Sequence, residues 1–180
     1  MITLRKFGMN ENEIIKYEKD NEQKLSKKVK NLYLKMDLFT NLDEKYIQEL
    51  EKMIGSNLPK DYRDFLKKNN GGYPDKQCFG NGNIVNFFLG FYPNTKPEVS
   101  INYYMQIYQG RYPDGTLPIA SAGVGDLILL GIEEKINSNI FYWDSNGEID
   151  YHNNVNNSFE NTSPISESFN GFLDILNYCE

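Results

Sequence analysis

Apolar side chains recur every three or four positions through the first 70 residues, which is the period of an amphipathic helix. The three stripes consist of Leu25, Val29, Leu32 and Met36, then Ile47, Leu50 and Ile54, then Leu58, Tyr62, Phe65 and Leu66. They predict three successive helices, within a helical composition that begins at Glu11 and follows a short strand in residues 1–7. Asn41 and Glu44 have the spacing of a capping box for the second helix, and Gly55 ends it. Pro59 suits the first position of the third helix.

After residue 72 the pattern changes to short apolar and aromatic runs separated by Gly, Asn and Pro, which predict β-strands. The expected strands are residues 84–92, 117–121, 126–132 and 140–144, and a turn at 144–147 leads into an antiparallel neighbour at 148–152. Residues 100–109 are interpreted as a helix and 153–162 as a loop. A closing helix begins at 163–164 and carries one stripe, made of Ile165, Phe169, Phe172, Leu173 and Leu176. Helices followed by a meandering sheet and one closing helix indicate an α+β fold.

The composition favours one main domain. The 180 residues include 11 Phe and 13 Tyr, enough apolar surface for a core. No run approaches the roughly 20 apolar residues that cross a bilayer, and no secretory signal follows the first basic residues. We therefore expect a cytoplasmic protein with no membrane partner, made of an extension at residues 1–40 and a domain at 41–180. A faint similarity between residues 18–33 and 51–66 is explained either by chance, which the abundance of Lys and Glu favours, or by a decayed repeat.

Residues that could carry catalysis or hold a metal are scarce. His152 is the only histidine, and Cys78 and Cys179 lie far apart in the sequence. In a reducing compartment, two such cysteines are expected to be free thiols. A lone imidazole leaves most acid–base and nucleophilic mechanisms without a partner group, and no zinc-ligand spacing occurs. The sequence therefore predicts a binding protein, not an enzyme, with no metal or other cofactor.

The net charge of −6 is unevenly distributed. Residues 1–70 hold 15 Lys and Arg against 12 Asp and Glu, a net +3, whereas residues 71–180 hold 4 against 13, a net −9. Two interpretations fit this pattern: solvated Lys/Glu helices beside a tyrosine-rich sheet, or an acidic aromatic surface that binds a basic partner protein. Direct binding to nucleic acid is disfavoured, because the lysines alternate with glutamates.

Tyrosines are densest in and around the expected helix at 100–109. On such a helix Tyr104 and Tyr108 share one face, and acidic Asp114 follows shortly after. Exposed tyrosines rimmed by carboxylates are typical of protein-binding hot spots, and burial against the sheet is the alternative. The predicted partner-contact residues are Tyr92, Tyr104, Tyr108, Tyr112, Asp114, Asp126 and Asp144.

Residues 123–126, Gly-Val-Gly-Asp, resemble a phosphate-binding loop only superficially. They lack the Gly-Lys-Ser/Thr of that loop and precede a strand, so we predict a tight turn. We expect the Asp126 carboxylate to accept hydrogen bonds from the backbone N–H groups of this turn. An alternative is that Asp126 and Asp144 form the carboxylate pair of a hydrolase. However, each of them could instead stabilise a local turn. Trp143 is expected in the core, facing the same way as Phe141, with its indole N–H hydrogen-bonded.

Four segments in order, NLPKDYRDFLKKNNGGYPD, LPIASAGVGDLILLGI, NIFYWDSNGEI and SESFNGFLDIL, resemble the motifs of the SUKH superfamily, also called the Smi/Knr family. The resemblance extends over about three quarters of the chain. It implies an α+β fold in which a mixed, largely antiparallel β-sheet packs against N-terminal helices and one C-terminal helix, with no catalytic residues. The motif residues with expected structural roles are Leu58, Pro59, Tyr62, Phe65, Leu66, Gly71, Gly72, Gly125, Trp143, Phe169, Phe172 and Leu173.

The resemblance also implies a function. Bacterial members are mostly immunity proteins that bind and neutralise toxins, often nucleases or deaminases, and fungal relatives act by binding in the regulation of cell-wall synthesis. A composition heavy in Asn, Lys and Ile is typical of an AT-rich bacterial genome, which favours the immunity branch. We therefore expect occlusion of a toxin domain with a basic surface. A regulatory or scaffold protein of the cell-wall-regulator type is the alternative.

Overall fold

Among the described residues, six antiparallel strands form the central sheet, in the same order in space as along the chain. The computed structural model describes residues 2–147 and 159–179. The strands are β3 (Cys78–Phe79), β4 (Asn83–Phe88), β5 (Thr116–Ala122), β6 (Asp126–Gly131), β7 (Ile140–Trp143) and β8 (Thr162–Ser166). A second, small sheet pairs β1 (Leu4–Arg5) with β2 (Tyr73–Pro74). This N-terminal strand therefore contacts the main domain directly, and the boundary at residue 40 stays a prediction.

Six α-helices accompany the sheets within the described residues. They are α1 (Glu11–Asp20), α2 (Lys27–Asp37), α3 (Glu44–Ile54), α4 (Lys60–Lys68), α5 (Ile101–Ile107) and α6 (Phe169–Ile175), with short 3₁₀ helices η1 (Glu134–Ile136) and η2 (Ser145–Gly147). In that part of the chain no helix has the length and apolar character needed to cross a membrane. The predicted α+β fold is confirmed.

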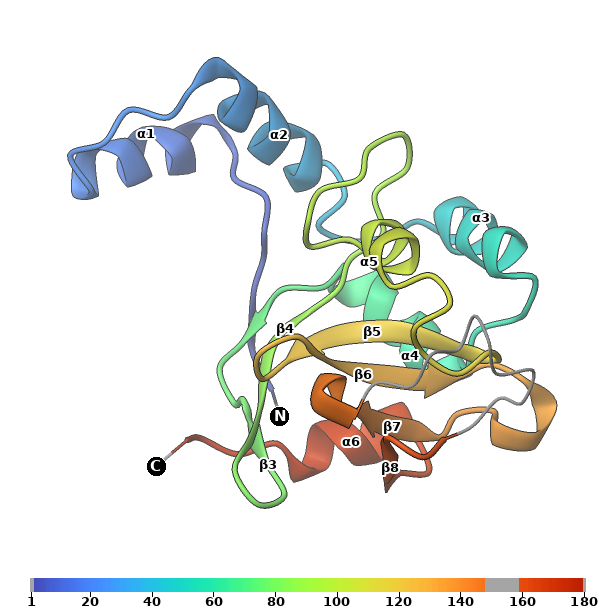
Figure 1. Ribbon diagram of the computed structural model, residues 1–180. Helices are drawn as coiled ribbons and strands as arrows, with labels where there is room; N and C mark the ends of the chain where they lie inside the picture. Colours follow the sequence, from blue (N-terminus) through green and yellow to red (C-terminus); the bar gives the residue numbers. More distant parts are fainter. Residues whose placement is uncertain (1, 148–158, 180) are drawn as a thin grey trace.

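Both faces of the sheet are covered, because alternate residues of each strand point to opposite sides. On one face Ile128, Leu130 and Ile140 belong to the main core, which the buried side chains of α3, α4 and α6 complete. On the other face lies a second cluster, made of Leu127, Leu129, Phe141 and Trp143. Figure 1 shows α5 above the sheet and α6 below it. The alternation in β6 and β7 thus separates a core from a second, thinner apolar layer.

The Leu-Pro to Gly-Gly motif builds α4 and its exit. Leu58, Pro59, Tyr62, Phe65 and Leu66 are all buried. Gly71 follows with a φ of +73°, and a Cβ there would lie 2.6 Å from the carbonyl oxygen of Phe88. At Gly72 the φ is +137°, and a Cβ would lie 2.7 Å from the carbonyl oxygen of Arg5. Only glycine suits both positions, since neighbouring backbone occupies the space of a side chain.

The helices α1 and α2 form a hairpin that projects from the body, which we call the arm (Figure 1). Asn10 caps α1 in a capping box with Glu13, and Ser26 caps α2. Inside the hairpin, buried Glu18 accepts a hydrogen bond from the backbone N–H of Leu25 at 2.7 Å and lies 2.8 Å from Nζ of Lys30. A buried, paired carboxylate therefore holds the two helices of the arm together.

Three predicted boundaries are wrong. The N-cap of α3 is Asp43, because the N–H of Leu42 bonds to Leu66 O and keeps Asn41 outside the helix. Pro59 occupies the N-cap of α4, one residue ahead of the predicted place. Residues 162–166 form β8, the outer strand paired with β7, where Pro164 is tolerated.

As a consequence, the closing helix begins at Phe169, where the Ser168 hydroxyl accepts a hydrogen bond from the N–H of Gly171. The predicted strand at 148–152 lies outside the described residues.

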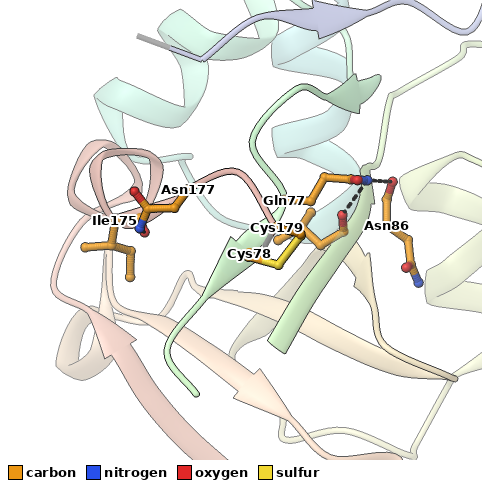
Figure 2. Close-up of a disulfide and its surroundings, with 7 residues drawn as sticks. Gln77, Cys78, Asn86, Ile175, Asn177 and Cys179 are labelled. Carbon is orange, nitrogen blue, oxygen red and sulfur yellow. Dashed lines mark hydrogen bonds between the residues drawn. A yellow bond between two sulfur atoms is a disulfide. The ribbon is translucent and has the colours of Figure 1, made fainter. Parts of the chain in front are cut away.

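Cys78 and Cys179 are bonded to each other, so the prediction of two free thiols is wrong. After α6 the chain returns along β3, and Asn177 exchanges two backbone hydrogen bonds with Cys78, at 2.9 and 2.8 Å. Figure 2 shows the bridge beside β3, with Asn177 on the returning segment. The 101 residues that separate the cysteines hide this proximity in the sequence. The C-terminal segment thus covers the β3 edge of the sheet.

Candidate partner-binding surface

Tyr104 of α5 and Tyr108, the C-cap residue of this helix, lie together on the sheet face that carries the second apolar cluster. The Ser100 side chain caps α5 by accepting from the N–H of Tyr103 at 3.2 Å, which fixes the helix in the predicted place. Four residues apart, the two tyrosines stack with ring centroids 5.6 Å apart. Tyr108 also meets Trp143 edge to face at 5.8 Å. With Tyr112 they pack against the second apolar cluster and are half-buried.

A tight turn borders these tyrosines. Gly123 and Gly125 both have positive φ angles, and the register pairs Ala122 with Asp126, so the predicted turn is confirmed. The Tyr108 hydroxyl donates to the Gly125 carbonyl oxygen at 3.3 Å, which joins α5 to the turn. Between the glycines, the side chain of Val124 is 94% exposed. We call Tyr104, Tyr108, Tyr112 and residues 123–125 the tyrosine face.

Asp126 holds the structure beneath this turn. Its carboxylate accepts hydrogen bonds from the N–H of Ser145 at 2.9 Å, from the Ser145 hydroxyl at 2.7 Å and from the Tyr142 hydroxyl. The prediction that it bonds to the amides of its own turn is wrong, because its partners lie on β7 and η2. Burial raises the pKa of Tyr142 above its usual value, and the bond to Asp126 raises it further. At 7% exposure, Asp126 has a structural role and offers little surface to a partner.

The other predicted contact residues are dispersed. Asp144 is half-buried after β7 and accepts from the N–H of Asn146 at 2.8 Å. Asp114 is exposed beside Tyr112, whose pKa is raised to about 12 by burial and then by the Asp114 charge. Tyr92 is 2% exposed and packs with Phe7 in a separate cluster, away from the tyrosine face. The structure therefore groups the tyrosines of α5 with the turn and leaves Tyr92 out.

Two further features were not anticipated. The guanidinium carbon of Arg111 lies 4.7 Å from the ring centroid of Tyr108, a cation–π contact. The sequence contains a hint of this contact, since Arg111 is one of four basic residues after position 70 and stands three residues from Tyr108. Trp143 is fully buried as predicted, but its indole N–H has no acceptor among the described residues. The predicted hydrogen bond of this indole therefore stays a prediction.

The tyrosine face offers aromatic and apolar contact surface. In the described part of the chain, no three His, Cys, Asp or Glu residues lie close enough together to hold a metal ion. The carboxylates of Asp126 and Asp144 both accept hydrogen bonds from backbone N–H groups of η2. Stacked tyrosines and an exposed valine suit the burial of apolar surface against another molecule.

Comparison with known proteins agrees with this architecture. The chain is 29% identical over 141 residues to the SPbeta prophage-derived uncharacterized protein YokK of Bacillus subtilis (strain 168). That alignment covers 67% of this chain and 72% of the relative. Residues 41–175 match the model of the SMI1 / KNR4 family (SUKH-1), from the segment before α3 to the end of α6. The chain therefore belongs to the SMI1 / KNR4 family (SUKH-1).

Proposed function

We propose that this protein is an immunity protein that binds a toxin domain with a basic surface and occludes it, without catalysis. The observation that carries the proposal is the tyrosine face, where stacked, half-buried tyrosines lie beside the turn that carries the exposed Val124. Family membership and the prophage origin of the Bacillus relative are compatible with that role.

The aromatic part of the surface supplies the contact area. Tyrosines have few rotatable bonds, so a partner gains a large contact at a small entropic cost. Tyr108 is already oriented by Tyr104, Trp143 and the Gly125 carbonyl oxygen. An interface of standard size buries about 800 Å² on each partner. A pre-oriented aromatic centre of this kind slows dissociation.

Charge supplies the rate of encounter. Residues 71–180, which include the tyrosine face, carry a net charge of −9. A basic toxin domain would be attracted to that part of the chain, and the attraction would weaken as salt screens it. We expect the association rate to fall when ionic strength rises. An association rate independent of salt would contradict this part of the proposal.

The test is co-expression with the toxin encoded in the neighbouring gene. Cells should survive with the wild-type protein, and Val124→Asp should weaken toxin binding by about tenfold, since a buried carboxylate replaces an apolar contact. Ile15→Asp is the matched control, because Ile15 is also exposed but belongs to α1 of the arm, which projects away from the sheet (Figure 1). If cells with and without the protein die equally, the immunity proposal is wrong.

A regulatory or scaffold role of the cell-wall-regulator type is the second candidate, supported by the same family membership. The two functions differ in what the tyrosine face contacts. A gene for a large secreted multidomain protein next to this one favours immunity. The regulatory role is favoured if the wild type stably binds a housekeeping protein and Val124→Asp loses that binding. In that case the protein should not change the survival of cells that express the toxin.

A further inference from the structure

The helix α2 has two apolar faces, and only one of them is covered by the protein. Leu32, Tyr33 and Met36 pack in the cluster that contains Phe7 and Tyr92. Leu34 and Leu38 are not part of that cluster, and Leu38 is 79% exposed. Leu38 is the C-cap residue of α2 and stands four residues after Leu34, so the two form a second stripe at the end of this helix. A helix with a second, open apolar stripe is suited to a further packing partner.

The other helix of the arm extends this open surface. Ile15 of α1 is 64% exposed, and with Leu25 and Leu34 it lines a hollow of about 510 Å³ between α1 and α2. An adjoining hollow of about 370 Å³ continues from Leu34 to Leu38. The two hollows share Leu34, Glu11 and Asn31, so they form one continuous groove along the arm. We call it the arm groove.

The charged residues that line the two sides of the arm groove differ: Glu11 comes from α1, whereas Lys27, Lys30, Lys35 and Asp37 come from α2. The helix α1 (Glu11–Asp20) holds four acidic and two basic residues, a net −2. The helix α2 (Lys27–Asp37) holds four lysines and one aspartate, a net +3. When a second copy is turned by a two-fold axis along the groove, each α1 lies against the α2 of the other copy. The same contact therefore buries the apolar stripe and pairs opposite charges.

We propose that two copies of this chain associate through their arm grooves and form a homodimer. Residues 71–180 are strongly acidic and repel their counterpart in another copy, whereas residues 11–37 have seven lysines and six acidic residues. Contact between two copies is therefore most favourable at the arm, which projects away from the sheet (Figure 1). The result is a layer of four helices, with both tyrosine faces left outside the contact.

The experiment measures the mass of the full chain by sedimentation at concentrations from about 1 to 100 μM, the range in which moderate affinities are resolved. The wild type should shift from monomer to dimer as concentration rises. Ile15→Asp and Leu38→Asp should each weaken dimerisation by about tenfold or more, because a carboxylate enters an apolar contact. Val124→Asp makes the same chemical change on the tyrosine face and should leave the dimer unchanged.

A double variant, Lys27→Glu with Lys35→Glu, tests the charge argument, since it places acidic residues opposite α1 of the other copy. This double variant should weaken dimerisation more strongly at low salt than at high salt. Circular dichroism verifies that the variants keep their helices. A monomer at every concentration overturns the proposal, and so does a dimer that Ile15→Asp and Leu38→Asp leave intact. The dimer proposal is also overturned if the wild type is a monomer and Ile15→Asp abolishes toxin binding. That result would mean that the arm groove binds the toxin.

Discussion

The Tyr142 hydroxyl donates a hydrogen bond to Oδ2 of Asp126, and this bond joins β7 to the first residue of β6. The other carboxylate oxygen, Oδ1, accepts from the backbone N–H and the hydroxyl of Ser145. One buried carboxylate thus fixes the end of β7, the η2 segment and the base of the exposed turn. The position of the tyrosine face depends on this group, because the Tyr108 hydroxyl bonds to Gly125, the residue before Asp126.

Asp126→Asn should lower the free energy of unfolding by about 2 kcal/mol, because the amide group presents donors to the donors of Tyr142 and Ser145. Urea denaturation followed by tryptophan fluorescence measures the change, since Trp143 lies on the same strand as Tyr142. Asp114→Asn removes a carboxylate from an exposed loop and should change stability by less than about 0.5 kcal/mol. Equal effects of the two substitutions would contradict the structural role of Asp126.

Tyr62→Phe should leave stability unchanged or raise it by about 1 kcal/mol. The side chain of Tyr62 is fully buried, and its hydroxyl has no hydrogen-bond partner within the described residues. Removing a buried, unpaired hydroxyl removes a desolvation penalty while the ring keeps its contacts with Phe65 and Phe169. The measurement is the free energy of unfolding of Tyr62→Phe compared with that of the wild type.

The matched control is Tyr142→Phe, which removes a hydroxyl that does bond to a carboxylate. It should lower the free energy of unfolding by about 1–2 kcal/mol. If Tyr62→Phe destabilises the protein as much as Tyr142→Phe does, the Tyr62 hydroxyl must have a partner after all.

Much of the fold follows from local periodicity. The stripe from Leu58 to Leu66 predicts α4 correctly because all of it faces one core. The apolar and aromatic run from Ile140 to Trp143 predicts β7, and it is continuous because the sheet buries both faces. Gly55 ends α3 in the left-handed conformation, as its position predicts. In each case a signal within a few neighbouring residues agrees with the final local structure.

Features that depend on distant partners could not be predicted in this way. Residues 162–166 form a strand because β7 offers them an edge, whereas their Ser and Pro content predicts a helix start. The bond between Cys78 and Cys179 depends on the return of the chain along β3. Asp126 bonds to Ser145, which is 19 positions away. The open groove of the arm was missed as well, because Leu34 and Leu38 lie outside the stripe that faces the body.

Reduction of the Cys78–Cys179 bridge should lower the thermal midpoint of the protein. The bridge closes a loop of 101 residues, and a crosslink of that span removes unfolded-state entropy with a typical effect of about 2–4 kcal/mol. Calorimetry with and without reductant measures the difference. The double variant Cys78→Ser/Cys179→Ser should unfold at the midpoint of the reduced wild type and show no response to reductant. If the wild type itself does not respond, the bridge contributes nothing to stability.

Acid should selectively weaken the contribution of Glu18 to the arm. Hydrogen bonds from Lys30 and from the Leu25 N–H lower the pKa of this carboxyl from 4.5 to about 2. Because the pKa is lower in the folded state, ionised Glu18 stabilises the protein fully above pH 4.5. That stabilisation is lost as the pH falls through the folded value of about 2.

Glu18→Gln should therefore be less stable than the wild type at pH 6, and the difference should shrink steadily between pH 4.5 and pH 2. Thermal unfolding across this range measures the difference, and the exposed substitution Glu49→Gln controls for the loss of one negative charge. The pairing of Glu18 with Lys30 and Lys24 joins the end of α1 to α2 and to the loop between them. A difference that stays constant down to pH 2 would mean that Glu18 acts through packing alone, and that its charge does not hold the arm together.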